Sequence, residues 1–187
     1  MVALSFAILL LLTLRSSALR VSIRLSRGLA VAFFIALAYA LLLSLGFLLG
    51  NALRLDNLAG DGLFDSVNAL VFLGLMLAVS LKVALPVLRS AKQDGPPAFD
   101  ISRWPTVFLL ALASGLDLFL VGLAQGFVLN ASRYLLFEAV TAFLLPFLLG
   151  YWGIMLGRRH KALKERRWRL IAVLILLVYA FFRMTNA

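Results

Sequence analysis

Long apolar stretches separated by short polar ones fill almost the whole chain. A helix needs about 20 apolar residues to cross a bilayer core about 30 Å thick. Six stretches suit that role, and they are Val2 to about Leu25, Leu29–Gly50, Asp65–Leu88, Pro105–Asn130, Tyr134–Gly157 and Leu170–Met184. The pattern therefore predicts an all-α integral membrane protein with six transmembrane helices, in a single membrane domain over residues 1–187.

The first apolar stretch leaves its own end open. Met1 to Leu14 lacks a basic leading region and an A-x-A-type cleavage site, so we expect a retained helix rather than a cleaved signal peptide. The helix either continues to about Leu25, or it ends near Leu19 and leaves the following arginines at the cytoplasmic surface.

Composition supports the membrane assignment. Hydrophobic residues make up 64% of the chain and charged residues 14%, whereas soluble domains are about 45–50% apolar. The net charge of +10 would suggest nucleic acid in a soluble protein; here it marks cytoplasmic loops, and no nucleic-acid partner is predicted. The chain has no cysteine and one histidine, His160, which argues against disulfides, thiolate chemistry and multi-histidine metal sites. No enzyme is predicted.

Basic residues alternate from loop to loop. Fourteen lie in or beside the first, third and fifth connections, against two, Arg54 and Arg133, in the second and fourth. Under the positive-inside rule this bias places the odd-numbered loops in the cytoplasm and both termini outside. Lys82 lies just inside the third span, within snorkelling distance of the cytoplasmic face. The basic segment Arg158–Arg169 is predicted to bind anionic lipid headgroups.

A helix-breaking segment, Gln93–Pro97, divides the chain into two halves of three helices each. The halves are residues 1–92 and 105–187, with a cytoplasmic linker at 93–104, and an odd number of helices makes them oppositely oriented. A shift of 100 residues places Ser17 on Asp117. Gly46–Gly50 also resembles Gly153–Gly157. Inverted repeats of this kind are typical of secondary transporters.

Asp117 lies near the middle of the fourth span, where a carboxylate costs several kcal/mol and is expected to face protein or water. Ser114 and Gln125 fall within about 80° of it on a helical projection. Glycines, among them Gly122, occupy a separate face suited to close helix packing. Carboxylate, hydroxyl and amide oxygens suit hard cations such as Mg²⁺ or Mn²⁺. We therefore predict a transported-ion site made by Asp117, Ser114, Gln125 and Ser17; the alternative is a protonated or salt-bridged structural aspartate.

The segment Ala113–Gly122 resembles the fourth-helix motif of the small bacterial manganese efflux pumps (MntP-like, within the LysE-type exporter superfamily). The length of the chain and the two predicted halves agree with that family. The resemblance implies Mn²⁺ export across the bacterial inner membrane, with Asp117 as one ligand. The family carries further acidic residues in helices one and two, where this chain has Ser17 and, near the second position, Tyr39. The acidic residues of the first repeat are therefore missing.

Two functions remain open at this point. The first is efflux of a divalent cation, Mn²⁺, by alternating access, with no resident cofactor. The second is a transport-inactive relative that serves as a structural or accessory subunit of a larger membrane complex. The partners considered are a second copy of the chain, in a homodimer, or the other subunits of such a complex. The second is favoured if arginines enter the cavity and Asp117 pairs with Arg15 or Arg20. A weaker third idea is transport of an anion or amino acid that uses these arginines.

Overall fold

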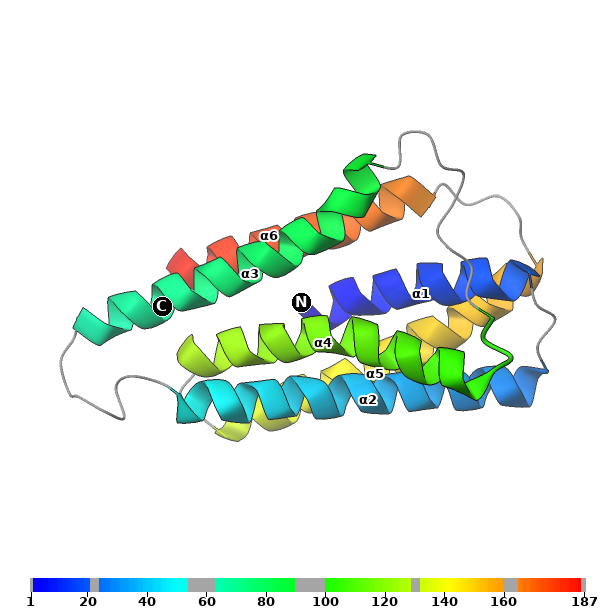
Figure 1. Cartoon of the computed structure of the whole chain (residues 1–187), viewed down its shortest axis with the longest axis horizontal. Coiled ribbons are helices and arrows are strands. Elements are labelled where there is room, and N and C mark those ends of the chain that lie inside the picture. Colours follow the sequence, from blue (N-terminus) through cyan, green and yellow to red (C-terminus); the bar gives the residue numbers. More distant parts are fainter. Residues whose placement is uncertain are drawn as a thin grey trace.

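The computed structural model describes residues 2–20, 24–53, 63–89, 100–128, 132–159 and 165–185, and these residues are almost entirely helical. The helices in these ranges are α1 (Val2–Arg20), α2 (Leu25–Ala52), α3 (Leu63–Arg89), α4 (Trp104–Val128), α5 (Ser132–Arg159) and α6 (Glu165–Thr185). Successive helices run in opposite directions, so α1, α3 and α5 end at the same end of the bundle at which α2, α4 and α6 begin (Figure 1). The predicted all-helical architecture is confirmed.

The boundary between the first two helices differs from the longer of the two predictions. Helix α1 ends at Arg20, and α2 already begins at Leu25. Arg24 precedes α2 in extended backbone conformation and is exposed, and Arg27 belongs to the first turn of α2. The interpretation in which the first helix ends near Leu19 is therefore correct, and continuation to about Leu25 is wrong.

Within the described residues, four helices have apolar segments long enough to cross a membrane. These segments are Leu25–Ala52, Val67–Leu85, Trp104–Val128 and Leu136–Gly157. Helices α1 and α6 carry shorter apolar segments, Val2–Arg15 and Leu170–Tyr179. Basic residues limit both, because Arg15 and Arg20 fall in the last turns of α1 and several arginines lie in the first turns of α6.

The helices form two groups. Helices α1, α2, α4 and α5 pack together, and α3 and α6 lie side by side along one flank of that group (Figure 1). The most extensive contacts are those of α2 with α4 and of α1 with α5, followed by that of α2 with α5. Helix α3 contacts α4 and α6, and α6 also contacts α1.

These contacts have a regular pattern. Exchanging α1, α2 and α3 for α4, α5 and α6 turns the α2–α4 contact into the α1–α5 contact, and the α3–α4 contact into the α1–α6 contact. The α2–α5 and α3–α6 contacts map onto themselves. Each principal helix contact therefore has a counterpart under exchange of the two halves.

Glycines allow α2 and α4 to approach each other closely. A Cβ atom placed on Gly122 of α4 would lie 2.2 Å from the carbonyl oxygen of Leu43 in α2, and one on Gly46 of α2 would lie 2.1 Å from the carbonyl oxygen of Phe119. Small residues stabilise helix association in lipid because they let backbones meet. The glycine face predicted for α4 is thus confirmed as its packing face against α2.

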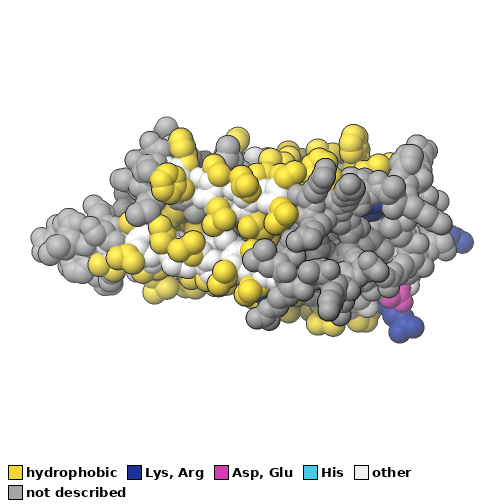
Figure 2. All heavy atoms as spheres, turned by 90° about the horizontal axis from the view of Figure 1, so that it is seen from above, with side chains coloured by type: hydrophobic (Ala, Val, Ile, Leu, Met, Phe, Trp, Pro, Cys, Tyr) yellow, Lys and Arg dark blue, Asp and Glu magenta, His cyan; other side chains and the backbone are white. Residues whose placement is uncertain are grey.

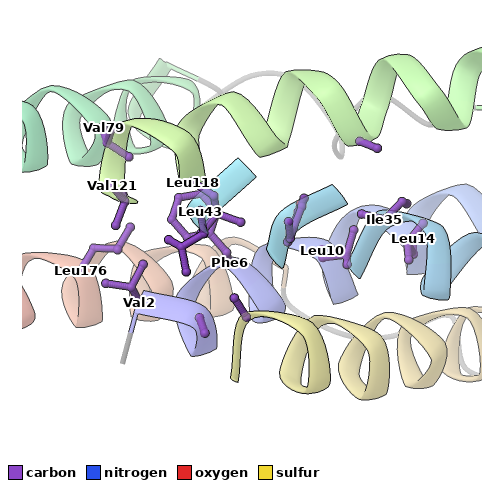
Figure 3. Close-up of a cluster of buried hydrophobic side chains, with 14 of the residues drawn as sticks. Val2, Phe6, Leu10, Leu14, Ile35, Leu43, Val79, Leu118, Val121 and Leu176 are labelled. Atoms are coloured by element: carbon purple, nitrogen blue, oxygen red, sulfur yellow. The ribbon is translucent and has the colours of Figure 1, made fainter. Parts of the chain in front are cut away.

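Apolar side chains from all the helices fill the centre of the bundle. Phe6 and Leu10 of α1, Ile35 of α2 and Leu118 of α4 are nearly or fully buried there (Figure 3). The outer surface is apolar as well, with exposed leucines and phenylalanines along the spans. In Figure 2 the described part of one face is mostly hydrophobic, and its charged side chains lie toward the right-hand end. This is the surface expected of a bundle surrounded by lipid.

Candidate functional site

Asp117 lies near the middle of α4 and faces a small, partly open cavity between the helices. The cavity has a volume of about 80 Å³, which is room for a few water molecules or a partly hydrated ion. Its walls come from the first four helices, and the lining residues are Phe6, Leu9, Leu10, Thr13, Tyr39, Val83, Leu110, Ser114 and Asp117. The predicted midspan carboxylate therefore does face an internal space, and most of that space is apolar.

The polar groups around the cavity are mainly hydroxyls. The Tyr39 hydroxyl of α2 is hydrogen-bonded to the Ser114 side chain, and it is close enough to Asp117 to be affected by the charge of that carboxylate. Ser114 donates a hydrogen bond to the carbonyl of Leu110, one turn earlier in α4. Thr13 donates in the same way to the carbonyl of Leu9, at 2.9 Å. One carboxylate and several hydroxyl oxygens thus face an otherwise apolar pocket.

The carboxylate has a cationic partner on the neighbouring helix. The Lys82 ammonium of α3 donates a hydrogen bond to Oδ1 of Asp117 and forms an ion pair with it. Of the two partners considered from the sequence, Arg15 is instead buried, with its carbonyl oxygen against Gly157 of α5. The side chain of the other, Arg20, is outside the described part of the structure. Lys82, which the sequence places within snorkelling distance of the cytoplasmic face, turns its ammonium to Asp117 in this conformation.

Gln125 does not reach the cavity, although it lies in the same angular sector as Asp117. Its amide nitrogen donates a hydrogen bond to the Tyr179 hydroxyl of α6 at 3.0 Å, and both side chains are buried. Eight residues separate Gln125 from Asp117, which is about 12 Å along a helix axis. The helical projection showed the shared direction but not this separation.

Ser17 also lies away from the cavity. It is fully buried, and its hydroxyl donates to the carbonyl of Thr13 at 2.9 Å, one turn beyond the cavity wall. The structure therefore brings together Asp117 and Ser114 of the predicted set and leaves out Gln125 and Ser17. The predicted set did not include Lys82 or Tyr39, although the family resemblance placed Tyr39 near the acidic position of helix two. For Lys82 the available signal was its positive charge, opposite to that of Asp117, inside a predicted membrane span.

The site has a simple charge pattern. Over the described parts of the chain, no group of three or more histidine, cysteine, aspartate or glutamate side chains is placed to hold a metal ion. A cation in the cavity would meet neutral hydroxyl oxygens and the single carboxylate of Asp117, which is paired with the Lys82 ammonium. Such oxygen ligands suit a hard divalent ion such as Mn²⁺, but with one negative charge instead of two or more.

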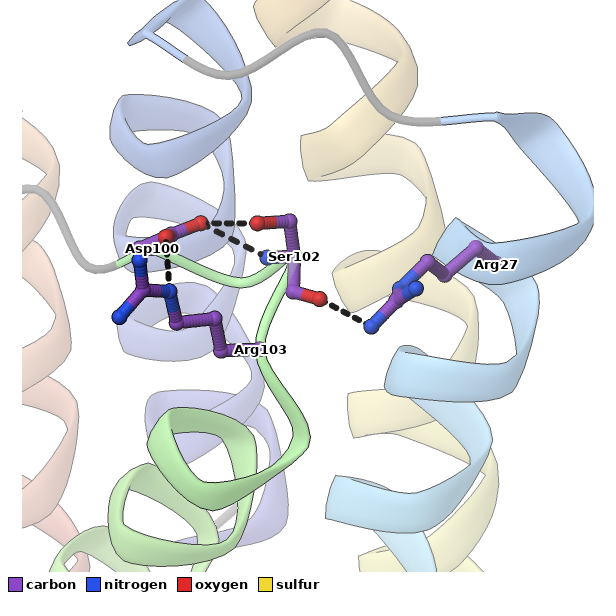
Figure 4. Close-up of polar contacts among 4 residues, drawn as sticks. All are labelled: Arg27, Asp100, Ser102 and Arg103. Carbon is purple, nitrogen blue, oxygen red and sulfur yellow. Dashed lines mark hydrogen bonds and ion pairs between the residues drawn. The ribbon is translucent and has the colours of Figure 1, made fainter.

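A second polar cluster joins the starts of α2 and α4 (Figure 4). Asp100 accepts hydrogen bonds from the backbone nitrogen of Ser102, at 3.1 Å, and from its hydroxyl, and it forms an ion pair with Arg103 at 3.2 Å. The carbonyl of Ser102 accepts a hydrogen bond from the Arg27 guanidinium, which also lies 5.8 Å from the centre of the Trp104 ring. Two segments predicted to lie on the same side of the membrane therefore meet here.

The ionised form of Asp100 is favoured by these contacts. The hydrogen bonds from Ser102, followed by the charges of Arg103 and Arg27, lower the pKa of Asp100 below its ordinary value of 3.8. The cluster therefore contributes most at neutral pH, and its contribution is lost as the pH falls through the lowered pKa.

We expect acid to loosen this cluster in the wild type and to have less effect on it in Asp100→Asn. The asparagine carries no titratable charge, so the protection of residues 100–104 against hydrogen exchange should start lower at neutral pH. It should then stay nearly constant as the pH falls below the ordinary carboxyl value of 3.8 and through the lowered pKa of Asp100, where the wild type loses protection. Equal pH dependence in the two proteins would contradict the assignment.

The fold and the cavity define a multi-pass membrane protein in which the carboxylate of Asp117 faces a cavity between the described helices. A comparison with protein-family models matches residues 22–183 to the family described as "Mntp: Putative manganese efflux pump". The chain belongs to this manganese efflux pump family, which is a family of transporters and not of enzymes. The match begins after α1. Searches of curated proteins and of solved structures gave no match.

Proposed function

We propose that the chain is an exporter of divalent cations in the bacterial inner membrane, with Mn²⁺ as its cargo and the Asp117 cavity as its cargo site. One observation carries the proposal: in a member of this family, the midspan carboxylate of α4 faces a cavity lined by the hydroxyls of Ser114, Tyr39 and Thr13. Asp117 would bind the cation directly, and the hydroxyls would replace part of its hydration shell.

Transport by alternating access requires two arrangements of the bundle around one site. Two inverted three-helix halves, 1–92 and 105–187, provide them by exchanging roles. The counterpart relation among the helix contacts supports this organisation. The described helix ends that flank the basic connections, namely the ends of α1, α3 and α5 and the starts of α2, α4 and α6, share one end of the bundle (Figure 1), which supports a cytoplasmic location for that end and an outer location for the termini.

The glycine contacts give the two halves a different register from the one the sequence suggested. Gly46 packs on Phe119 of α4, and its counterpart Gly153 packs on Leu11 of α1. This pairing corresponds to a shift of 108 residues between α1 and α4. Asp117 then corresponds to Leu9, which lines the same cavity, and not to Ser17. In this register the cargo site therefore receives an acidic side chain from α4, Asp117, and none from α1.

The proposal is tested by measuring Mn²⁺ flux through purified protein reconstituted into liposomes that contain a Mn²⁺-quenched dye. We expect the dye to be quenched faster than in protein-free liposomes. The rate should fall when an excess of another divalent cation, which does not quench the dye, competes with Mn²⁺. Flux at the protein-free rate, from protein that is folded and correctly inserted, would contradict export.

A second candidate function has one specific observation in its favour. The Lys82–Asp117 ion pair leaves the cavity without net charge, as expected of a transport-inactive relative that serves as a subunit of a membrane complex. Purification in mild detergent separates the two: stoichiometric partners together with absent flux would favour the subunit. A lone monomer or homodimer with flux would favour the exporter. Residues 160–164 of the predicted lipid-binding segment Arg158–Arg169 lie outside the described residues, and the interaction of the segment with anionic headgroups stays a prediction.

A further inference from the structure

We propose that Lys82 is a tethered cation that occupies the Asp117 carboxylate in the empty transporter and must leave before a cargo cation binds. This inference rests on the proposed function of the cavity. The Lys82 ammonium donates directly to Oδ1 of Asp117, so ammonium and cargo need the same negative charge.

The competition follows from the charge count of the cavity. Asp117 is the acidic residue among those lining the cavity. With Lys82 in place, a divalent ion would enter a largely apolar space with no net compensating charge, which is strongly unfavourable in a bilayer interior. With Lys82 withdrawn, the carboxylate is available to the ion. Release of the lysine is therefore a condition of cargo binding.

The geometry shows which partner moves. The Asp117 side chain is 13% exposed, whereas that of Lys82 is 60% exposed. The carboxylate is thus largely enclosed in the cavity wall, and the lysine reaches it from the edge of the bundle, next to the lining residue Val83. Lys82 lies seven residues before the end of α3 at Arg89, about 10 Å along the helix. Its long side chain has the reach to snorkel toward the interface when displaced.

The ion pair also connects the two helix groups of the bundle. Lys82 belongs to α3, which lies beside α6, and Asp117 belongs to α4 in the main group (Figure 1). Cargo binding would break this link, and cargo release would restore it. When the ion pair has re-formed, the positive charge of Lys82 balances the negative charge of Asp117, and the empty carrier changes conformation with an uncharged site. A bare carboxylate in the membrane interior would be costly during that step, and Lys82 supplies the charge that removes this cost.

The test uses the absence of cysteine in the natural chain. Lys82→Cys introduces a unique thiol, and aminoethylation of that thiol restores a cation of lysine-like length. Equilibrium binding of Mn²⁺ alone is measured on the purified variant before and after aminoethylation, with wild type and Lys82→Arg as references. We expect unmodified Lys82→Cys to bind Mn²⁺ at least about tenfold more tightly than wild type, equivalent to about 1.4 kcal/mol. Aminoethylation should reverse the gain.

Because the same folded protein is compared before and after modification, a folding defect cannot produce this reversal. Lys82→Gln serves as a second variant and should show the same gain. Equal affinities in wild type, Lys82→Gln and both forms of Lys82→Cys would overturn the role of Lys82. The exporter assignment would still stand if Asp117→Asn removed the Mn²⁺ binding and flux of wild type. Absence of Mn²⁺ flux in wild type would instead contradict the exporter assignment itself, and this inference with it.

Discussion

Asp117→Asn is expected to reduce Mn²⁺ flux in reconstituted liposomes to the rate of protein-free liposomes. The substitution keeps the size of the side chain but removes the charge that faces the cavity. The fold should survive, because the partner Lys82 is 60% exposed and can turn toward the interface rather than stay buried without a counter-ion. The measurement is initial flux at equal amounts of inserted protein.

Two matched variants make this result specific to the cavity. Asp100→Asn removes a carboxylate outside the membrane-spanning part of α4 and should leave the flux near that of wild type. Ser114→Ala removes one hydroxyl from the cavity and should reduce the flux by about tenfold or less, the range expected for one neutral hydrogen-bonding group. Flux of Asp117→Asn equal to that of wild type would exclude Asp117 as a cargo ligand.

The second large effect concerns helix packing. Gly122→Ala is expected to destabilise the protein by about 1–3 kcal/mol, as overpacking does in tight interiors. The added Cβ would lie 2.2 Å from the carbonyl oxygen of Leu43 and 3.0 Å from the backbone nitrogen of Phe47. Both atoms belong to the backbone of α2, so the helices must separate. The melting midpoint in detergent, followed by size-exclusion chromatography after heating, measures the change.

Gly74→Ala is the matched control for this prediction. Gly74 also lies within a helix, but a Cβ atom there would meet nothing within 4 Å. Its replacement should therefore leave the melting midpoint unchanged or raise it slightly, because alanine has the higher helix propensity. Equal midpoints for the two variants would contradict the close α2–α4 contact.

The sequence was sufficient for the helices and for the two faces of α4. Apolar length predicts helices whose bounds agree closely for α3, α4 and α5. Spacing at 100° per residue separates the glycine face from the face of Ser114 and Asp117, and the structure places the first against α2 and the second on the cavity. These features are local, so periodicity alone determines them.

Periodicity did not predict the register between the two halves or the ion pair of Asp117, because both depend on contacts between segments that are distant in the sequence. The shift of 100 residues aligned polar residues, Ser17 with Asp117, whereas the helices meet where glycines face carbonyl groups, which gives Leu9 as the counterpart of Asp117. The pairing of Lys82 with Asp117 depends on α3 lying next to α4 and on the direction of a flexible side chain. A lysine inside a predicted span marks Lys82 as a candidate ion-pair partner, but no pattern within α3 or α4 shows which carboxylate it contacts.

The most direct test of the central claim is whether Mn²⁺ occupies the cavity beside Asp117. Ser114→Cys places a thiol on the cavity wall in a chain without natural cysteine, and Gly74→Cys places a control thiol where no side chain contacts it. The measurement is the rate of labelling by a small water-soluble thiol reagent with and without Mn²⁺. The cavity assignment predicts that Mn²⁺ slows labelling at position 114, leaves the slow labelling at position 74 unchanged, and has no effect at 114 when Asp117→Asn is added. Labelling at position 114 that is insensitive to Mn²⁺, in protein that transports Mn²⁺, would contradict it.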